Sequence, residues 1–528
     1  MRLVEAGVYQ PTRQAGWVGG AWARVSAARV PFAVAAVLLV GAGVRFWGLG
    51  TKSLWFDETY SVFIARQALV DIPRMLQTYD THPPLHYVLL HVWMALFGSG
   101  EASIRIPSVL ASVGAILLTF FLGRRLAGDR VGLLAAALLA VSPFQVTSAQ
   151  EARMYPFLTL FGLGASYALW LALEEGRRRH WTAYALLMVL ALYTHHFAFL
   201  LLGAQAVYVL ATYRRKAAVG RWFLSLAVVA VAYLPLVPTF LAQMGTGRGW
   251  PDFRPPFGLR ALTDMMGMFS FGGGLFGMGT YFRVGALPLE YRAAIILPFA
   301  ILGLAGAAGL EEWRRRGFIL SYWLVPVVTV SVISLQWNMF YQRYFSFVLP
   351  PFLILLAAGV FYVAERMRGT GKVVTTVSLL LVLAAFNLPV LANLYREPST
   401  YDWRAAAQHV SAKAGPKDFI LFIPGFARIP FQYYFSGPQV QASLNPKLLR
   451  FAQEEMRLAE GDTERFAAIA KKYPRMWIVA TIPIGYKARQ QIAKVLAPAF
   501  READGRSFGL VFTFLWESRL YGTAPGNR

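Results

Sequence analysis

The sequence predicts a mostly α-helical protein that crosses a membrane many times and ends in a small α/β domain. Three observations lead to this fold class. Of the 528 residues, 57% are hydrophobic and only 15% are charged, against about a quarter charged in soluble domains. Apolar stretches of about 17–23 residues recur over most of the chain, long enough for a hydrocarbon core of ~30 Å. Short basic clusters separate these stretches, and the final part of the chain alternates between helix-like and strand-like patterns.

Composition also excludes several classes of protein. A net charge of +24 would suit a nucleic-acid-binding protein, but the basic residues lie between apolar segments and form no single soluble face, so we expect no nucleic acid partner. The chain has no cysteine, which excludes disulfides, thiolate metal sites and a cysteine nucleophile. The first apolar stretch begins only near Val30 and is too long for a cleavable signal, so residues 1–29 are expected to be a cytosolic leader.

The basic clusters orient the predicted spans, because Lys and Arg in short loops stay in the cytosol. After the arginine-bearing leader, such clusters occur at 124–130, 177–179, 214–216, 314–316 and 366–372. Two spans fit between successive clusters, which gives eleven spans in all, near 30–48, 106–123, 131–147, 156–173, 181–194, 197–212, 222–241, 293–310, 317–336, 345–363 and 373–394. An odd number of spans with a cytosolic N-terminus places the residues after 395 outside.

Residues 84–97 are apolar but are not counted as a span. Fourteen residues are typical of an interfacial or re-entrant helix, and counting them would put two basic clusters outside. The first external loop, 50–104, is therefore expected to carry helices that lie on the membrane. The loop 243–292 is also expected outside despite five arginines, because the charge rule weakens for long loops.

The C-terminal part, 396–528, is predicted to be an external α/β domain that follows the transmembrane domain 30–395. Helix-like and strand-like patterns alternate there, which favours a partly parallel sheet. The expected helices are 402–414, 448–472 and 486–496, and the expected strands are 419–423, 476–480 and 510–517.

Two polar clusters fall in the first external loop. Asp57 and Glu58 follow the first span in an aromatic setting, where burial could tune the pKa of a general base. Acids at a helix N-terminus that complement its dipole are the alternative. His82 precedes two prolines, which make a rigid turn before 84–97. His82 and His86 have the spacing of two metal ligands, but no third ligand is evident and no metal site is predicted.

Two further clusters lie at predicted external span ends. Glu151, Arg153 and Tyr155 stand within five residues, a pattern that suits a polar head group or an ordinary polar turn. Arg343 is the only charged residue between Arg316 and Glu365 and is followed by Tyr344. A guanidinium there suits a lipid phosphate, which Arg binds with two hydrogen bonds, or simply an arginine that snorkels in an aromatic belt. The predicted topology places all four clusters on the same side of the membrane.

Several short motifs resemble, in order along the chain, those of the class C glycosyltransferases. They are Asp57-Glu58, His82-Pro-Pro-Leu, Arg105-Ile-Pro-Ser, Gln150-Glu-Ala-Arg-Met-Tyr155 and Gln342-Arg-Tyr344. The resemblance covers about 30–395 and points in particular to the protein O-mannosyltransferase and lipid A aminoarabinose transferase families. Tyr401-Asp-Trp-Arg404 is similar to the start of the C-terminal domain in bacterial relatives.

This resemblance implies a bacterial cytoplasmic membrane enzyme that uses a sugar donor linked to a polyprenyl phosphate on the outer face. Asp57 would take the proton of the acceptor hydroxyl, and attack at the anomeric carbon would displace the lipid phosphate with inversion. Glu58 would support or orient that catalytic site. The other implied contacts are the donor phosphate for Arg343, Tyr344 and His82, and the substrate cavity for Glu151, Arg153, Tyr155 and Arg105.

For the cofactor and the acceptor, the resemblance implies classes and not single compounds. No nucleotide leaves in such a reaction, so no cofactor is required. Glu151 falls where these enzymes often have a second acidic motif, which keeps a divalent metal among the options. The sequence lacks the large inserted external domain of the protein O-mannosyltransferases, which counts against a protein acceptor. The acceptor classes considered are a protein, a lipid and a cell-wall glycan. The alternatives are a lipid-linked sugar flippase or transporter and a non-catalytic envelope-glycan-binding membrane protein. Transporters carry ionisable residues midway through their spans, and no Asp or Glu stands mid-span here.

Overall fold

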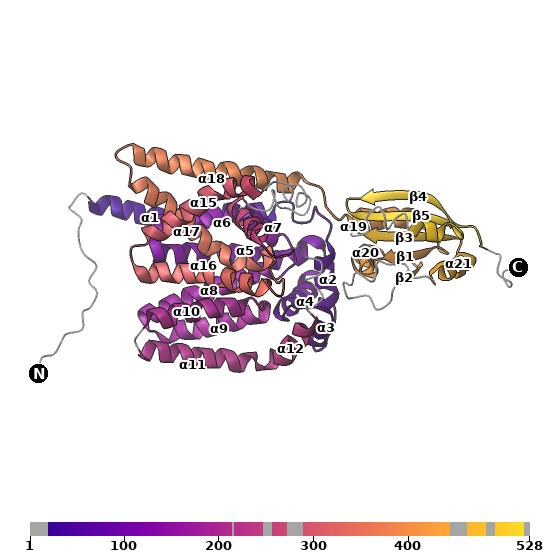
Figure 1. The fold of residues 1–528 in the computed structure, drawn as a ribbon, viewed down its shortest axis with the longest axis horizontal. Helices are drawn as coiled ribbons and strands as arrows, with labels where there is room; N and C mark the ends of the chain where they lie inside the picture. Colours follow the sequence, from indigo (N-terminus) through magenta and orange to yellow (C-terminus); the bar gives the residue numbers. More distant parts are fainter. Residues whose placement is uncertain are drawn as a thin grey trace, which may run out of the picture.

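The computed structural model describes residues 19–213, 216–246, 256–271, 289–443, 462–481 and 492–521. It consists of a helical bundle and a smaller part built around a sheet, which lies beyond one end of the bundle (Figure 1). Most of the predicted leader and much of the predicted loop 243–292 fall outside the described residues. The same holds for the first part of the expected helix 448–472 and for 486–491.

Each of the eleven predicted spans falls on one helix or on two or three consecutive helices. The elements that carry them are α1 (Gly19–Phe46), α5 (Glu101–Ala127), α6 (Asp129–Val141), α7 (Pro143–Ala149), α8 (Tyr155–Glu175), α9 (Arg178–Thr194), α10 (Ala198–Thr212), α11 (Lys216–Tyr233), η1 (Leu234–Leu236), α12 (Val237–Thr246), α15 (Leu289–Gly309), α16 (Trp313–Ser334), η4 (Gln342–Val348), α17 (Leu349–Glu365) and α18 (Gly371–Arg396). One further helix, α13 (Leu259–Phe271), lies in the described part of the predicted loop 243–292.

Within the described ranges, seven helices are long and apolar enough to cross a membrane, or eight if the bent pair α6–α7 forms one span. Shorter apolar helices add α4 (Leu85–Phe97), α10 and residues 293–309 of α15. The chain is therefore a multi-pass membrane protein, and its count of eleven spans stays a prediction.

The predicted loop 50–104 forms three short helices at the sheet end of the bundle (Figure 1). They are α2 (Phe56–Ala65), α3 (Ile72–Tyr79) and α4, and they pack on one another through a cluster that includes Tyr60, Ile64, Leu76 and Tyr87. At 13 residues, α4 is about 20 Å long, less than the ~30 Å of a hydrocarbon core. Its length fits the expected interfacial helix.

The basic clusters gather at the opposite end of the bundle. Arg125 pairs with Glu175 at 2.9 Å, and Arg315 donates to the carbonyl oxygen of Leu126 at 3.3 Å. Arg105 and Arg125 belong to the same helix, α5, and twenty residues of helix separate them by roughly 30 Å. This segregation supports the expected orientation, which remains a prediction.

The C-terminal part contains a five-stranded mixed sheet in the order β2-β1-β3-β5-β4. β1 (Phe419–Ile423) pairs in parallel with β2 (Val440–Ser443) and β3 (Arg475–Thr481), whereas β5 (Val511–Ser518) is antiparallel to β3 and β4 (Phe500–Phe508). The partly parallel sheet is thus confirmed. β2 and β4 were not predicted from the sequence; β4 is an edge strand whose side chains are mostly exposed, so its pattern lacks an apolar run.

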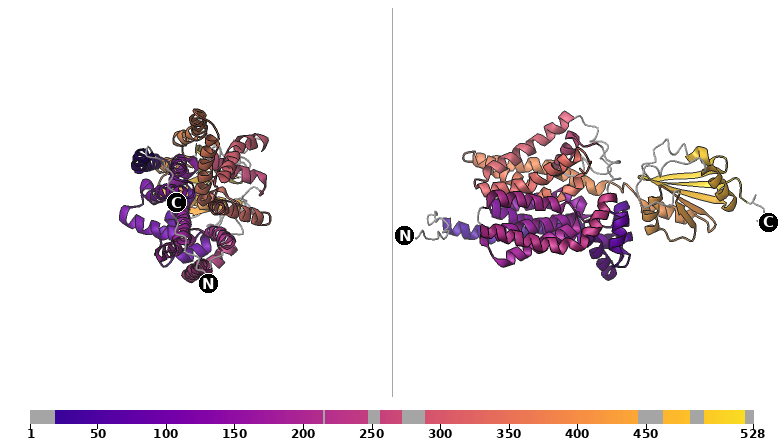
Figure 2. Two further views of the ribbon diagram at one scale, coloured as in Figure 1. Left: turned by 90° about the vertical axis from the view of Figure 1, so that its left-hand side faces the viewer. Right: turned by 60° about the horizontal axis from the view of Figure 1, so that its bottom comes forward.

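Among the described residues, the helices α19 (Trp403–Lys413), α20 (Arg428–Tyr434) and α21 (Asp462–Lys472) accompany this sheet, and residues 492–496 of the expected helix 486–496 are also helical. The sheet-containing part is offset from the bundle, and α19 and α20 lie on its bundle-facing side (Figures 1 and 2). α18 ends at Arg396 and α19 begins at Trp403, and we retain the division near residue 396 as a proposal.

Two glycines bring α15 and α17 into backbone contact. A Cβ added at Gly306 would lie 1.9 Å from the carbonyl oxygen of Leu355, and one at Gly359 would lie 2.0 Å from that of Leu302. Small residues at such crossings let membrane helices approach closely.

We predict that Gly306→Ala lowers the free energy of unfolding by roughly 1–3 kcal/mol, because α15 and α17 must separate to admit the methyl group. Thermal unfolding in detergent measures the effect. Gly303→Ala is the matched control on the same helix, since its Cβ would meet its nearest neighbour only at 3.9 Å. Equal melting temperatures for the two variants would contradict the packing argument.

Candidate functional site

All four polar clusters of the sequence meet at the sheet end of the bundle. The residues come from α2, the start of α5, the connection between α7 and α8, the turn before α4, and η4. Direct contacts join them across long sequence separations: Glu58 with Arg105, Asp57 with Arg153, and Glu151 with Arg343.

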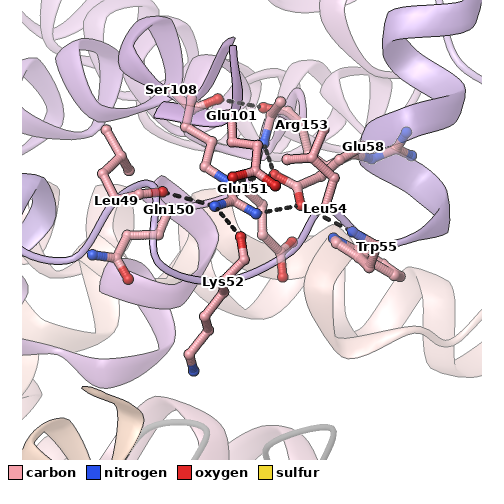
Figure 3. Close-up of polar contacts among 12 residues, drawn as sticks. Leu49, Lys52, Leu54, Trp55, Glu58, Glu101, Ser108, Gln150, Glu151 and Arg153 are labelled. Carbon is pink, nitrogen blue, oxygen red and sulfur yellow. Dashed lines mark hydrogen bonds and ion pairs between the residues drawn. The ribbon is translucent and has the colours of Figure 1, made fainter. Parts of the chain in front are cut away.

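Glu58 and Arg105 form a buried, two-pronged ion pair. Arg105 Nε donates to Glu58 Oε1 at 2.7 Å and Arg105 Nη2 donates to Oε2 at 2.8 Å. Glu58 is fully buried and Arg105 is 4% exposed. Glu58 also accepts from the backbone N–H groups of Trp55 and Ala152, so it caps the first turn of α2 and holds the α7–α8 connection (Figure 3).

The remaining donors of Arg105 bind the loop between α1 and α2. Arg105 Nη1 donates to the carbonyl oxygens of Leu49 at 2.7 Å and Lys52 at 2.9 Å (Figure 3). Arg105 Nη2 also approaches the carbonyl oxygen of Ser53 at 3.4 Å. With its donors engaged in this way, Arg105 shapes the loop that leads into Asp57.

Asp57 lies on the first turn of α2 with its side chain 27% exposed. Arg153 Nη2 is 3.9 Å from its carboxylate, and Arg153 Nη1 donates to the Asp57 carbonyl at 3.2 Å and to the Ser61 hydroxyl at 3.1 Å. Arg153 is itself 3% exposed. The arrangement presents one carboxylate to solvent beside a buried guanidinium.

Glu151 and Arg343 form a second ion pair, with Nη1 and Oε2 2.7 Å apart. The guanidinium of Arg343 also lies over the ring of Trp55, 4.8 Å from its centroid, a cation–π contact. Burial raises the pKa of the Glu151 carboxyl to about 7; Arg343 opposes this shift, while Glu58 and Asp57 add to it. Glu151 therefore changes its charge close to neutral pH.

His82 belongs to a third pair. Its Nδ1 lies 2.6 Å from Asp80 Oδ1, and Tyr87 donates to Asp80 Oδ2 at 2.6 Å. Burial alone would raise the pKa of Asp80, but His82, Arg153 and Tyr87 together hold it well below its usual range. His86 bonds instead to the carbonyl oxygen of Ala152, so the two histidines do not face a common metal position.

A cavity of about 430 Å³ is lined by both members of the Glu58–Arg105 and Glu151–Arg343 pairs. The predicted site residues that line it are Glu58, Arg105, Glu151, Tyr155 and Arg343. Asp57 is not among its described lining residues, although Trp55 and Glu58 on either side of it are. Arg153 is buried against Asp57 and likewise does not line the cavity within the described part of the chain.

The three residues expected at the donor phosphate occupy two places. Arg343 lines the cavity. His82 and Tyr344 are not among its described lining residues, and their ring centroids lie 6.0 Å apart. Tyr155 links the two places, because it lines the cavity and its ring lies 6.1 Å from that of Tyr344.

The sequence reasoning missed several polar residues of this region. Lys52 lines the cavity and donates to the carbonyl oxygen of Leu394 at 2.7 Å, and Asp80 orders His82. Asp80 stands two residues before His82, a spacing that could have suggested the pair. The cavity wall also includes Arg260, Asp264 and Asn393, which no motif identified. Tyr401 lines it too, although its motif pointed only to the start of the C-terminal domain.

Across the described ranges, no group of three or more His, Cys, Asp or Glu side chains is arranged to hold a metal ion.

Comparison with known proteins gives partial sequence matches. A family described as dolichyl-phosphate-mannose-protein mannosyltransferase matches residues 81–240. An undecaprenyl phosphate-α-4-amino-4-deoxy-L-arabinose arabinosyl transferase of Pseudomonas paraeruginosa is 26% identical over 392 residues, which is 61% of this chain and 69% of the relative. The enzyme of the same description from Pseudomonas aeruginosa is 33% identical over 152 residues, 27% of this chain and 28% of the relative.

Solved structures share the fold over nearly the whole chain. ArnT from Cupriavidus metallidurans, crystallised with undecaprenyl phosphate, has a TM-score of 0.56 at 15% identity and covers 93% of this chain and 99% of its own. The Archaeoglobus fulgidus oligosaccharyltransferase AglB, in complex with an inhibitory peptide and a dolichol-phosphate, has a TM-score of 0.56 at 14% identity, covering 94% of this chain and 74% of its own. The chain thus has an ArnT-like class C glycosyltransferase fold, and the resemblance stated from its motifs is confirmed.

We predict that Arg105→Met lowers the free energy of unfolding by about 3–5 kcal/mol, because it leaves the buried Glu58 carboxylate without its partner. Melting temperatures in detergent measure the loss. Arg124→Met is the control on the same helix, where the pair with Asp129 is about half exposed and contributes at most about 1 kcal/mol. A similar small effect for both variants would contradict the role of the buried pair.

Proposed function

We propose that this chain is an inverting glycosyltransferase that moves a sugar from a polyprenyl-phosphate-linked donor to an acceptor hydroxyl. The donor class is supported by relatives described as undecaprenyl-phosphate sugar transferases and by proteins of the same fold solved with undecaprenyl phosphate or dolichol-phosphate. The observation that carries the proposal is the set of paired acids and arginines at a single end of the bundle, where the Glu58–Arg105 and Glu151–Arg343 pairs line one cavity and Asp57 pairs with Arg153 beside Glu58.

In the proposed reaction, Asp57 is the general base. Its partly exposed carboxylate accepts the proton of the acceptor hydroxyl, and the acceptor oxygen forms a bond to the anomeric carbon. The bond from that carbon to the phosphate oxygen breaks, and its electron pair stays on the lipid phosphate. Attack from the face opposite the leaving group inverts the configuration.

Arg343 is the proposed partner of the donor phosphate. The phosphate becomes a monoester as the sugar leaves, so negative charge grows there, and a fixed guanidinium stabilises the transition state more than the bound substrate. The contact with Trp55 and the pair with Glu151 fix Arg343 in the cavity wall. His82 and Tyr344 add contacts to the donor behind Tyr155.

Glu58 is proposed as a positioning residue rather than a proton acceptor, because Arg105 and two backbone N–H groups occupy its carboxylate. Glu151, Arg153 and Tyr155 complete the surroundings of the reacting groups. No nucleotide leaves, so the proposal requires no cofactor.

We also propose that the reaction takes place on the outer face of a bacterial cytoplasmic membrane. The site and the basic clusters lie at opposite ends of the bundle, and basic clusters favour the cytosol. This orientation places the N-terminus in the cytosol and the C-terminal domain outside. The acceptor is a protein, a lipid or a cell-wall glycan.

We predict that the purified protein releases the lipid phosphate from at least one member of a panel of polyprenyl-phosphate sugars, including mannose and aminoarabinose donors. Asp57→Asn should reduce this transfer by at least about a hundredfold, the lower range for loss of a general base. Asp129→Asn, at the basic end of α5, is the matched control. Donor movement across vesicles without release of lipid phosphate would favour a flippase instead.

We predict that the apparent KM for the donor falls as the pH decreases from 8 to 6. Below a pKa of about 7 the Glu151 carboxyl becomes neutral, its attraction for Arg343 weakens, and the guanidinium is left for the donor phosphate. The charged groups facing Glu151 are Arg343, Glu58, Asp57 and Arg153. Initial rates at several donor concentrations measure the trend, and Glu151→Gln should remove it; a KM that rises as the pH falls would refute this reading.

A further inference from the structure

The loop that leads into Asp57 is held by side chains from the C-terminal part of the chain. Three consecutive backbone N–H groups precede Phe56, and each donates to a different side-chain oxygen. Ser53 N–H donates to Ser399 Oγ at 3.1 Å, Leu54 N–H donates to the Tyr434 hydroxyl at 2.7 Å, and Trp55 N–H donates to Glu58 at 3.3 Å. Two of these three partners lie beyond α18.

Tyr434 connects this loop to the first residue of α5. Its hydroxyl accepts from Leu54 N–H and donates to the carboxylate of Glu101. Glu101 also pairs with Arg404 of α19. Arg404 in turn donates through its backbone N–H to Ser53 Oγ at 3.3 Å and through Nη2 to the Gly50 carbonyl oxygen at 3.2 Å.

Apolar contacts extend the same interface along α2. The ring of Phe426, which precedes α20, meets that of Phe56 edge-on at 5.0 Å. Ile429 packs on the cluster that contains Tyr60 and Ile64. The C-terminal domain therefore touches both the loop before Asp57 and the helix on which Asp57 stands.

Within the described residues, the N–H groups of Ser53 and Leu54 are bonded to the C-terminal part of the chain and not to the bundle. Arg105 holds the carbonyl oxygens of Leu49 and Lys52, but the N–H groups of Ser53 and Leu54 depend on the C-terminal partners. Ser53 and Leu54 are 6% and 0% exposed, so water cannot readily replace those partners. Displacement of a catalytic group by about 1 Å can cost a hundredfold in rate.

We propose that Tyr434, assisted by Arg404, is a positioning residue for Asp57, so that the C-terminal domain forms part of the catalytic site. The expected effect on the reaction rate rests on the proposed function. The role of Tyr434 in ordering the loop before Asp57 does not. Tyr434 itself touches neither the reacting atoms nor the donor. Its effect passes through the Leu54 N–H group to the backbone that sets the first turn of α2.

The test compares Tyr434→Phe with Tyr433→Phe. Both remove one partly buried hydroxyl from the same short helix, but the Tyr433 hydroxyl donates to the Ser99 carbonyl oxygen, outside the loop that leads into Asp57. We expect Tyr434→Phe to lower kcat by roughly five- to twentyfold with little change in the donor KM. The reason is that one hydrogen bond to the loop is lost and the Asp57 carboxylate is held less rigidly. Tyr433→Phe should keep the kcat of the unaltered protein.

Amide hydrogen exchange supplies a readout that does not depend on transfer. In Tyr434→Phe, the peptide that contains Leu54 should exchange at least several-fold faster, whereas Tyr433→Phe should leave it unchanged. Equal exchange of this peptide in both variants, or an unaltered kcat in Tyr434→Phe, would overturn the positioning role. Absence of transfer by the unaltered protein would instead refute the proposed function, and exchange alone would then decide the role of Tyr434.

Discussion

The site depends on the buried ion pair between Glu58 and Arg105. Removing two charges from water is costly, and the cost is offset only when the charges are paired and their remaining polar atoms are bonded. Here the guanidinium and the carboxylate bind each other twice, and both also bind backbone. Their bonds reach the loop after α1, the cap of α2, the start of α5 and the α7–α8 connection. These four segments carry or flank Asp57 and Glu151, so a single pair sets the relative positions of the proposed reacting groups.

Around this pair, the other ionisable groups at the sheet end are also matched in sign. Asp57 faces Arg153, Glu151 binds Arg343, and Asp80 binds His82. These pairs differ in how firmly they are engaged. Glu58 and Asp80 are buried and bonded on both oxygens, whereas Asp57 is partly exposed and Glu151 lies in a cavity wall. The two firmly held acids suit a structural role, and the two less confined acids suit contact with substrate.

Sequence patterns predicted the helical bundle, the partly parallel sheet and the placement of the four polar clusters on one side. The spacing of apolar stretches and basic clusters carries that information locally, because each span must be apolar over its own length. The pairing of Glu58 with Arg105 could not be predicted in this way, since it depends on which helices become neighbours after packing. The same is true of Lys52 and Leu394, and of Leu54 and Tyr434. β4 escaped detection because an exposed edge strand does not need an apolar pattern.

The bond between Leu54 and Tyr434 also has a consequence for biogenesis. The two residues are 380 positions apart, so the ribosome needs roughly 20–80 s to add the second after the first, at about 5–20 residues per second. During that interval α1, α2 and α5 can already be inserted, while the N–H groups of Ser53 and Leu54 still lack their partners. A nascent chain would therefore carry Asp57 and Glu58 before the loop that leads into them has its hydrogen-bond partners. That loop would reach its final structure only after the last quarter of the chain has begun to leave the ribosome.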